Sequence, residues 1–359
     1  MKKALLTAAL ATLTFATANA GSINLELRAD MLSSDFNTDA GNADYYKFYL
    51  QTGRVDFKGS LMEGLDYRLR WRFNSAPSAD MGSVSTNDFA YVSHKMNDMF
   101  KFTFGKQGTG IGGFEGNTAG SDLYFTSFFY GGSTANLGVA ASSRYRGYAS
   151  MIYATGVKAD VTSGDHGLSL GAYNNDGSQS PQNKGMFGAF YSGAFMDKAL
   201  KVTAGQLSVP SSNTTGTAGY TADDKSTYTN VGVGYTMGSM DILFDYNMHQ
   251  QKFKSSGNDV TYDLTGPVLL VKYGMGNWTP QFKYAMAAET VKVQGSADQK
   301  NTFTDMGLAA EYKPETDKNF RYHFAYNNRA AKYDSTVATT SPAETQIIAG
   351  MKIYADFLK

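Results

Sequence analysis

The segment Leu65–Phe73 reads LDYRLRWRF and alternates strictly between apolar and charged side chains. The apolar residues are Leu65, Tyr67, Leu69, Trp71 and Phe73, and Asp66, Arg68, Arg70 and Arg72 lie between them. Successive side chains on a β-strand point to opposite faces, so this segment predicts a strand with one apolar and one strongly charged face. Such a strand suits a water-soluble sheet, whose apolar face covers a core. It equally suits a membrane barrel, whose apolar face contacts lipid while the arginines line an aqueous channel.

The same alternation recurs through most of the chain and predicts sixteen strands, five before residue 108 and eleven after residue 146. They span about 23–31, 46–59, 65–73, 88–96, 100–107, 147–160, 168–175, 185–195, 200–210, 227–237, 240–251, 262–273, 278–293, 302–313, 320–333 and 344–358. Short turns, such as 97–98 and 238–239, alternate with longer polar loops, such as 175–184 and 211–226. An even strand number with short turns at one end and longer loops at the other is the pattern of a transmembrane antiparallel β-barrel.

One connection departs from this pattern. Residues Gly108 to Arg146 form a long, glycine-rich and irregular segment. A structureless segment of this length inside a compact domain usually has a function. No helix signal follows Gly110–Phe114, so a loop that cradles a phosphate is not expected there. The glycines instead give the backbone the freedom that a loop folded inside a barrel needs.

Two details of the strand pairing are predicted. If the turn SLMEG at 60–64 joins the second and third strands, Arg54 lies beside Arg70, Asp56 beside Arg68 and Lys58 beside Asp66. Cross-strand neighbours on one face interact most strongly, so this pairing balances the charges at the turn end and leaves the other end basic. Pro267 lies within the strand expected over 262–273. Because proline cannot donate a ladder hydrogen bond, a bulge or a break is expected there.

The N-terminus has the features of a secretory signal peptide. Lys2 and Lys3 precede an apolar stretch, Ala4–Phe15, which is followed by the small-x-small sequence Ala18-Asn19-Ala20. We therefore expect cleavage before Gly21. The predicted organisation is a signal peptide over 1–20 and a single transmembrane β-barrel domain over 21–359, which places the protein in a bacterial outer membrane.

The composition agrees with an exported barrel. The 359-residue chain has 38 Gly but only 7 Pro and no Cys, and it contains 24 Tyr and 23 Phe. Such a chain suits many strands and tight turns, and it can form no disulfide. No run of about 18 apolar residues follows the signal, so no transmembrane helix is expected. Removing the two signal lysines leaves 32 − 2 = 30 basic against 32 acidic residues, a balance that argues against a nucleic-acid partner.

The sequence carries no motif for catalysis or for a cofactor. The four histidines (His94, His166, His249 and His323) lack the spacing of metal ligands. The chain has no thiol nucleophile, no GxSxG and no HExxH. We therefore expect neither an enzyme nor a metal or cofactor site.

At this point the chain resembles the general porins of the Gram-negative outer membrane. The resemblance rests on the strand number, the alternation of turn and loop lengths, the long loop after the fifth strand, and the segments GRVDFKGSLMEGLDYRLRWRF and AYVSHKMNDMFKFTFGKQ. It implies that 108–130 folds into the barrel as a constriction loop, with Glu115 and Asp122 as its acidic residues. It also implies that Arg54, Arg68, Arg70 and Arg72 form a facing basic wall, and that the protein is a homotrimer. One departure is the end IYADFLK, where family members typically end on phenylalanine.

The expected function is passive diffusion of small hydrophilic solutes and ions through the channel of the barrel. Outer-membrane lipids are expected to surround the barrel. The arginines predict a positive field that raises the local anion concentration. The lumen is also expected to carry Asp56, Asp66, Asp241, Asp245 and Glu289. The alternatives are a substrate-specific channel for sugars, phosphate or other anions, a barrel adhesin or enzyme, and a soluble secreted sandwich. The specific channel would use Phe114, Tyr124, Phe125, Phe128 and Phe129 as a binding slide.

Overall fold

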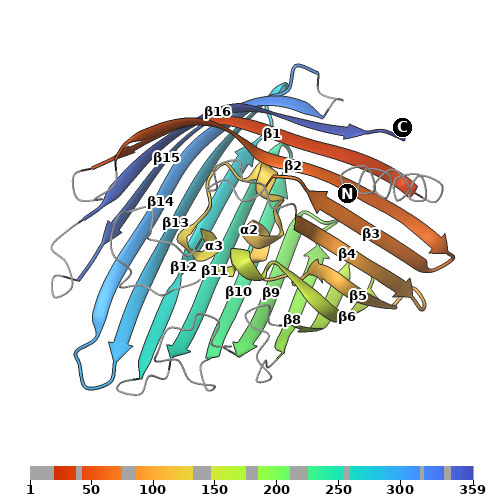
Figure 1. Ribbon diagram of the computed structural model, residues 1–359, viewed down its shortest axis with the longest axis horizontal. Coiled ribbons are helices and arrows are strands. Elements are labelled where there is room, and N and C mark those ends of the chain that lie inside the picture. Colours follow the sequence, from red (N-terminus) through yellow and green to blue (C-terminus); the bar gives the residue numbers. More distant parts are fainter. Residues whose placement is uncertain are drawn as a thin grey trace, which may run out of the picture.

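A computed structural model describes residues 20–37, 43–74, 86–131, 147–174, 185–210, 225–253, 259–315, 319–334 and 341–358. Sixteen strands are found in this part of the chain, and they form one closed antiparallel barrel (Figure 1). The strands are β1 (Ala20–Phe36), β2 (Tyr45–Met62), β3 (Leu65–Arg72), β4 (Thr86–Lys95), β5 (Phe100–Gly108), β6 (Tyr153–Ser163), β7 (His166–Tyr173), β8 (Met186–Phe195), β9 (Leu200–Pro210), β10 (Lys225–Met237), β11 (Met240–Phe253), β12 (Val260–Tyr273), β13 (Trp278–Val293), β14 (Gln299–Tyr312), β15 (Phe320–Lys332) and β16 (Ala343–Asp356). Each strand pairs with its neighbours in sequence, and β1 closes the ring by pairing with β16.

The strand prediction is confirmed in number and, within a few residues, in position. β9 and β13 have the predicted bounds, and β1 is longer at both ends. β6 begins only at Tyr153, because Tyr148–Met151 forms a 3-10 turn, η4. The expected break at Pro267 is not found, since β12 continues through it. The pairing with β13 nevertheless has a gap between Thr265 and Val268.

The side chains are distributed inside out relative to a soluble protein. On β15, Tyr322, Phe324 and Tyr326 point outward and are 47%, 53% and 38% exposed, while His323 points inward and is 5% exposed. The same alternation runs around the barrel, with large apolar groups outside and buried charged or amide groups inside. Trp278 packs against Tyr312 on the outer face, with ring centroids 4.8 Å apart and ring planes tilted by 41°. This arrangement fits lipid outside and polar groups within, and it excludes the soluble sandwich.

The pairing predicted for β2 and β3 is wrong by two residues. Arg54 pairs with Arg72, Asp56 with Arg70 and Lys58 with Arg68. The strands extend closer to the turn than the prediction assumes, and a bulge lies between Ser60 and Met62. The reversal itself occurs at Gly64, whose φ of +73° suits glycine. This moves the centre of the hairpin toward the C-terminus and shifts each partner by two residues.

The connections separate into two ends of the barrel. The turns after β2, β4, β6, β8, β10, β12 and β14 are short and lie at one end, which we call the short-turn end. The connections after the odd-numbered strands lie at the opposite end, which we call the loop end. The predicted loops at 175–184 and most of 211–226 lie outside the described residues, as does the signal peptide over 1–19. Among the described helices, none has the length and apolarity to span a membrane.

Candidate functional site

The described part of the connection between β5 and β6 lies within the ring of strands (Figure 1). It contains the short helix α2 (Gly113–Asn117), the 3-10 turn η2 (Gly120–Asp122) and the short helix α3 (Phe128–Gly131). Residues 132–146 of the predicted loop lie outside the described part of the chain. We call residues 109–131 the lumenal loop. Its contacts decide which part of the barrel wall remains free to face solute.

Glu115 fixes the lumenal loop to β13. Its carboxylate forms an ion pair with Lys283, and both side chains are 3% exposed. The backbone N–H of Ser127 and the hydroxyl of Tyr148 donate to the same carboxylate at 2.7 and 2.8 Å. Burial alone would raise the pKa of Glu115, but the Lys283 charge and these hydrogen bonds hold it below its usual range. The residue is therefore a buried anion that ties three segments together.

Asp122 fixes the other end of the loop to β15 and β16. It pairs with Arg321, and Lys352 Nζ lies 2.6 Å from its Oδ1. Burial opposes ionisation, yet the charges of Lys352 and Arg321 lower the pKa of Asp122 to about 2. Both acidic residues implied by the porin resemblance are thus engaged by cations of the β13–β16 wall rather than by the arginines of β2 and β3.

Further contacts attach the lumenal loop to the same side of the barrel wall. Asp245 on β11 accepts from the backbone N–H of Phe114 at 3.0 Å. Arg28 on β1 donates to the carbonyl of Leu123 at 2.7 Å, and its ring-face contact with Tyr124 is 4.7 Å. Tyr124 in turn donates to Glu311 on β14 at 2.7 Å. Side chains from β1 and β11 to β16 therefore hold the loop.

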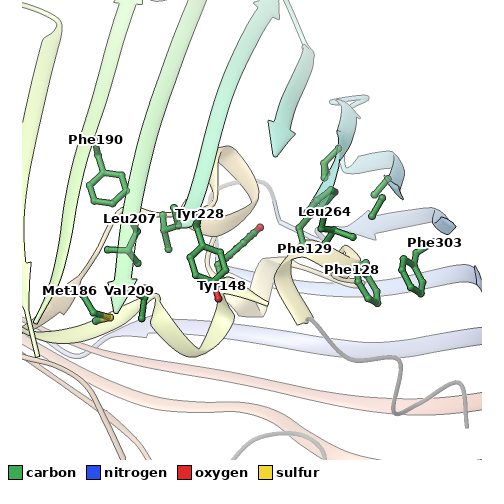
Figure 2. Packing of buried hydrophobic residues seen from close by; sticks show 14 of the residues in the cluster. Phe128, Phe129, Tyr148, Met186, Phe190, Leu207, Val209, Tyr228, Leu264 and Phe303 are labelled. Carbon is green, nitrogen blue, oxygen red and sulfur yellow. The ribbon is translucent and has the colours of Figure 1, made fainter. Parts of the chain in front are cut away.

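Aromatic side chains pack the loop against this wall. Figure 2 shows Phe128, Phe129 and Tyr148 among Leu264, Tyr228 and Phe303 of the barrel. The Phe128 and Phe303 rings are stacked 3.9 Å apart. Phe125 lies over Gly307, where a Cβ atom would overlap its ring. The proposed aromatic slide is thus mostly absent from the solute path: Tyr124, Phe125, Phe128 and Phe129 are at most 8% exposed.

The four predicted arginines lie together on the inner faces of β2 and β3, and they form ion pairs with three carboxylates. Arg68 and Arg70 contact Asp56 Oδ2 at 2.6 and 3.3 Å. Arg72 and Arg54 contact Asp88 at 3.2 and 3.1 Å, and Arg54 also reaches Glu26 at 3.5 Å. The side chains of Arg68, Arg70 and Arg72 stay 16–19% exposed, whereas that of Arg54 is 3% exposed.

A bulge in β4 supplies partners that the sequence analysis missed. Trp71 pairs with Asn87 and Arg70 with Phe89, so Asp88 is an extra residue between two ladder pairs. This places both Asp88 and Phe89 toward the arginines. The Phe89 ring lies under Arg68 and Arg70, at 4.1 and 4.6 Å from the guanidinium carbons. The predicted basic end of the hairpin is therefore partly neutralised by Asp88.

Among the described residues, an open cavity lies on the side of the barrel opposite the strands that hold the lumenal loop. This cavity of about 710 Å³ is lined by β3 to β10 and by α2. Its basic lining residues are Arg68, Lys101, Lys158, Lys198 and Lys201, and its aromatic ones include Phe89, Tyr91, Phe114 and Phe190. Lys101 and Lys158 share Asp160 at 3.3 and 3.7 Å. Cations on the loop side hold the loop, whereas these five basic residues face the cavity.

Known proteins share this architecture. An anion-selective porin from Comamonas acidovorans aligns with a TM-score of 0.63 at 12% identity, over 93% of this chain and 98% of that chain. OmpF of Salmonella typhi, in complex with daunomycin, gives 0.60 at 13% identity, over 93% and 97%. The fold is that of a sixteen-stranded outer-membrane porin.

Two further comparisons bear on this chain. A trimer form of OmpT, an outer membrane protein of Vibrio cholerae, aligns with a TM-score of 0.56 at 15% identity, over 92% of this chain and all of that chain. The family model described as "Phosphate-selective porin O and P" matches residues 22–190. No curated protein matches the chain.

Most of the lumenal residues that the sequence analysis did not assign to the site have no distinctive sequence pattern around them. Lys283, Arg321 and Lys352 are single cations in ordinary alternating strands, and their partners on the loop are more than 150 residues away in sequence. Their inward phase along each strand was available from alternation alone. Within the described residues, no group of three His, Cys, Asp or Glu side chains could hold a metal ion.

Proposed function

We propose that this porin passes small hydrophilic solutes by passive diffusion and favours anions. The observation that carries the proposal is the partition of lumenal cations. Those on β13, β15 and β16 pair with Glu115 or Asp122 of the loop, and cations on β3, β5, β6 and β9 line the open cavity. A solute therefore meets a mainly basic wall inside a water-filled passage, where a positive field raises the local anion concentration.

In this proposal the predicted site residues have two roles. Arg68, Arg70 and Arg72 act on the solute, because they remain partly exposed. Arg54 is buried and supports Asp88 and Glu26. Glu115 and Asp122 act by fixing the loop and thereby setting the width of the passage, with no catalysed step.

The proposed anion preference is tested with the triple variant Arg68→Gln/Arg70→Gln/Arg72→Gln in a planar bilayer. Under a salt gradient, the reversal potential should shift toward cations relative to the unaltered protein, because three cations are lost while Asp56 and Asp88 remain. A matched control is Lys95→Gln/Lys313→Gln, which removes two charges from the short-turn end of β4 and β14. An unchanged reversal potential in the triple variant, with normal conductance, would reject the arginine wall as the selectivity element.

A substrate-specific anion channel is the second candidate. The cavity combines lysines with Phe89, Tyr91, Phe114 and Phe190, so an organic anion could contact a charged and an aromatic surface together. The matching family model is described as phosphate-selective, which also favours an anionic substrate. Conductance that saturates with one anion, and block of chloride current by that anion, would support this candidate over general diffusion.

We also propose export through a cleaved signal peptide and assembly as a homotrimer. The trimer form recorded for OmpT of Vibrio cholerae supports the second point. Channel openings in groups of three, from single insertion events, are the expected result in a bilayer.

A further inference from the structure

The outward face of β10 to β15 changes character toward the loop end. In the middle of the barrel, one row of neighbouring residues is Phe244, Leu269, Tyr284 and Met306, on β11 to β14. Toward the loop end, one row is Lys225, Lys252, Thr261 and Lys292, on β10 to β13. The apolar row suits contact with lipid acyl chains. The lysine-containing row marks the edge of this apolar zone toward the loop end.

Five outward lysines share this edge: Lys225, Lys252, Lys292, Lys300 and Lys332. We call them the outer lysine band. All five are exposed, whereas their strand neighbours Gln251, Val291, Asn301 and Ala331 point inward and are buried. Each lysine lies within two residues of the loop end of its strand. Lys300 pairs with Thr290, and Lys332 pairs with Thr302, so the band continues from β10 to β15.

Among the described residues, the lysines of the band outnumber the carboxylates close to them. Lys225 and Lys252 are directly opposite each other on adjacent strands, a placement of like charges that is unfavourable unless something screens it. On these strand faces the acidic residue is Asp263, which Lys292 and Gln250 contact at 2.8 and 2.6 Å. Asp298, in the turn after β13, also acts on Lys292. Asp334 accepts from the backbone N–H of Lys300 at 3.2 Å. Among the described residues, five lysines thus face three nearby carboxylates.

We propose that the outer lysine band binds the phosphate groups of a phosphorylated lipid in the leaflet at the loop end. The opposed Lys225 and Lys252 side chains start from paired positions about 5 Å apart, so both ammonium groups can reach one phosphate. The apolar rows directly below would contact the acyl chains of the same molecule. A phosphorylated lipid satisfies both zones, whereas a soluble anion would use only the first. This inference is independent of solute passage through the lumen.

The experiment measures lipid binding by native mass spectrometry of the detergent-solubilised protein. The probes are diphosphoryl lipid A and its dephosphorylated form. Lys225→Gln/Lys252→Gln should bind the diphosphoryl probe about tenfold more weakly than the unaltered protein, because each lysine near an anionic headgroup contributes roughly 1 kcal/mol and 1.4 kcal/mol is tenfold. The dephosphorylated probe should bind both proteins equally. Channel conductance should be unchanged, which separates this result from any failure of the proposed function.

The matched control is Lys95→Gln/Lys313→Gln, with the same charge change at the short-turn end. It should bind the diphosphoryl probe within about twofold of the unaltered protein. Equal loss in both double variants would mean a non-specific charge effect and would overturn the proposal. Displacement of the lipid by inorganic phosphate at the same phosphate concentration would show a free-anion site and would also overturn it. Heat-modifiable migration on gels checks that each variant is folded.

Discussion

Lys283 shows how one buried charge can organise the lumen of a barrel. It sits on a strand whose inward side chains are otherwise small or polar, and it contacts both the Glu115 carboxylate and the carbonyl of Phe125, the latter at 3.0 Å. Removing one partner of a buried pair leaves the other charge without compensation, which costs far more than loss of an exposed pair. The loop position should therefore depend on this residue more than on any exposed lumenal lysine.

We predict that Lys283→Met releases the lumenal loop while the strands still close. Losing a buried partner costs about 3–5 kcal/mol, so the temperature at which the folded band disappears on gels should fall clearly. Single-channel current should become larger or noisier. The matched control is Lys101→Met, because Lys101 is 48% exposed in its pair with Asp160. An exposed pair is worth about 0–1 kcal/mol, so this control should keep the parental melting temperature. Equal stability of both variants would contradict the role given to Lys283.

The lumenal loop is the element that divides the barrel into a packed and an open side. Charged contacts orient it, and aromatic contacts with small wall residues let it approach closely. Gly307 on β14 is the clearest such contact, because the Phe125 ring occupies the space that any side chain there would need. The short helices of the loop are too brief to be stable alone, so their geometry depends on the wall.

Gly307→Ala should displace the loop at Phe125. The added methyl group overlaps the ring, and overpacking of this kind costs about 1–3 kcal/mol. The expected result is a lower melting temperature together with an altered single-channel conductance. Gly167→Ala is the control, since Gly167 is also an inward strand glycine and a Cβ atom there would come no closer than 3.4 Å to Ser192. If both variants behave like the parent, close packing at Gly307 does not position the loop.

The sequence predicted the strands better than it predicted the site. Period-two alternation identifies each strand, because every strand separates lipid from water. The β2–β3 pairing was wrong because the chain reverses at Gly64, later than the prediction assumed, and the role of Asp88 was missed because a bulge reverses its expected phase. The partners of Glu115 and Asp122 could not be predicted, since they depend on how the loop crosses the lumen and not on local pattern.

The whole barrel combines a polar interior, an apolar exterior and an uneven internal charge. Because the cations that line the cavity lie on one side of the barrel, the field that a solute meets comes from Arg68, Lys101, Lys158 and Lys201 acting together. Such a field acts over a distance that depends on dissolved salt. The Debye length is about 10 Å at 0.1 M and about 3 Å at 1 M.

Anion preference should therefore weaken as salt concentration rises. The reversal potential at a fixed concentration ratio, measured from about 0.05 to 1 M salt, should approach zero at the high end. Block by a specific organic anion should persist better, because close contacts in the cavity are screened less. A preference that is constant over this range would point to selection by direct contact rather than by the field of the wall.

Closure of the ring by β1 and β16 has a consequence for how the protein is made. Asn24 pairs with Asp356, so residues from the two ends of the chain must meet before the last ladder forms. Until then both terminal strands expose unpaired N–H and C=O groups, which are templates for aggregation. Non-local pairing of this kind also slows folding. The unfolded chain therefore keeps both strand edges exposed until β16 pairs with β1, and a product truncated before β16 should be degraded rather than inserted.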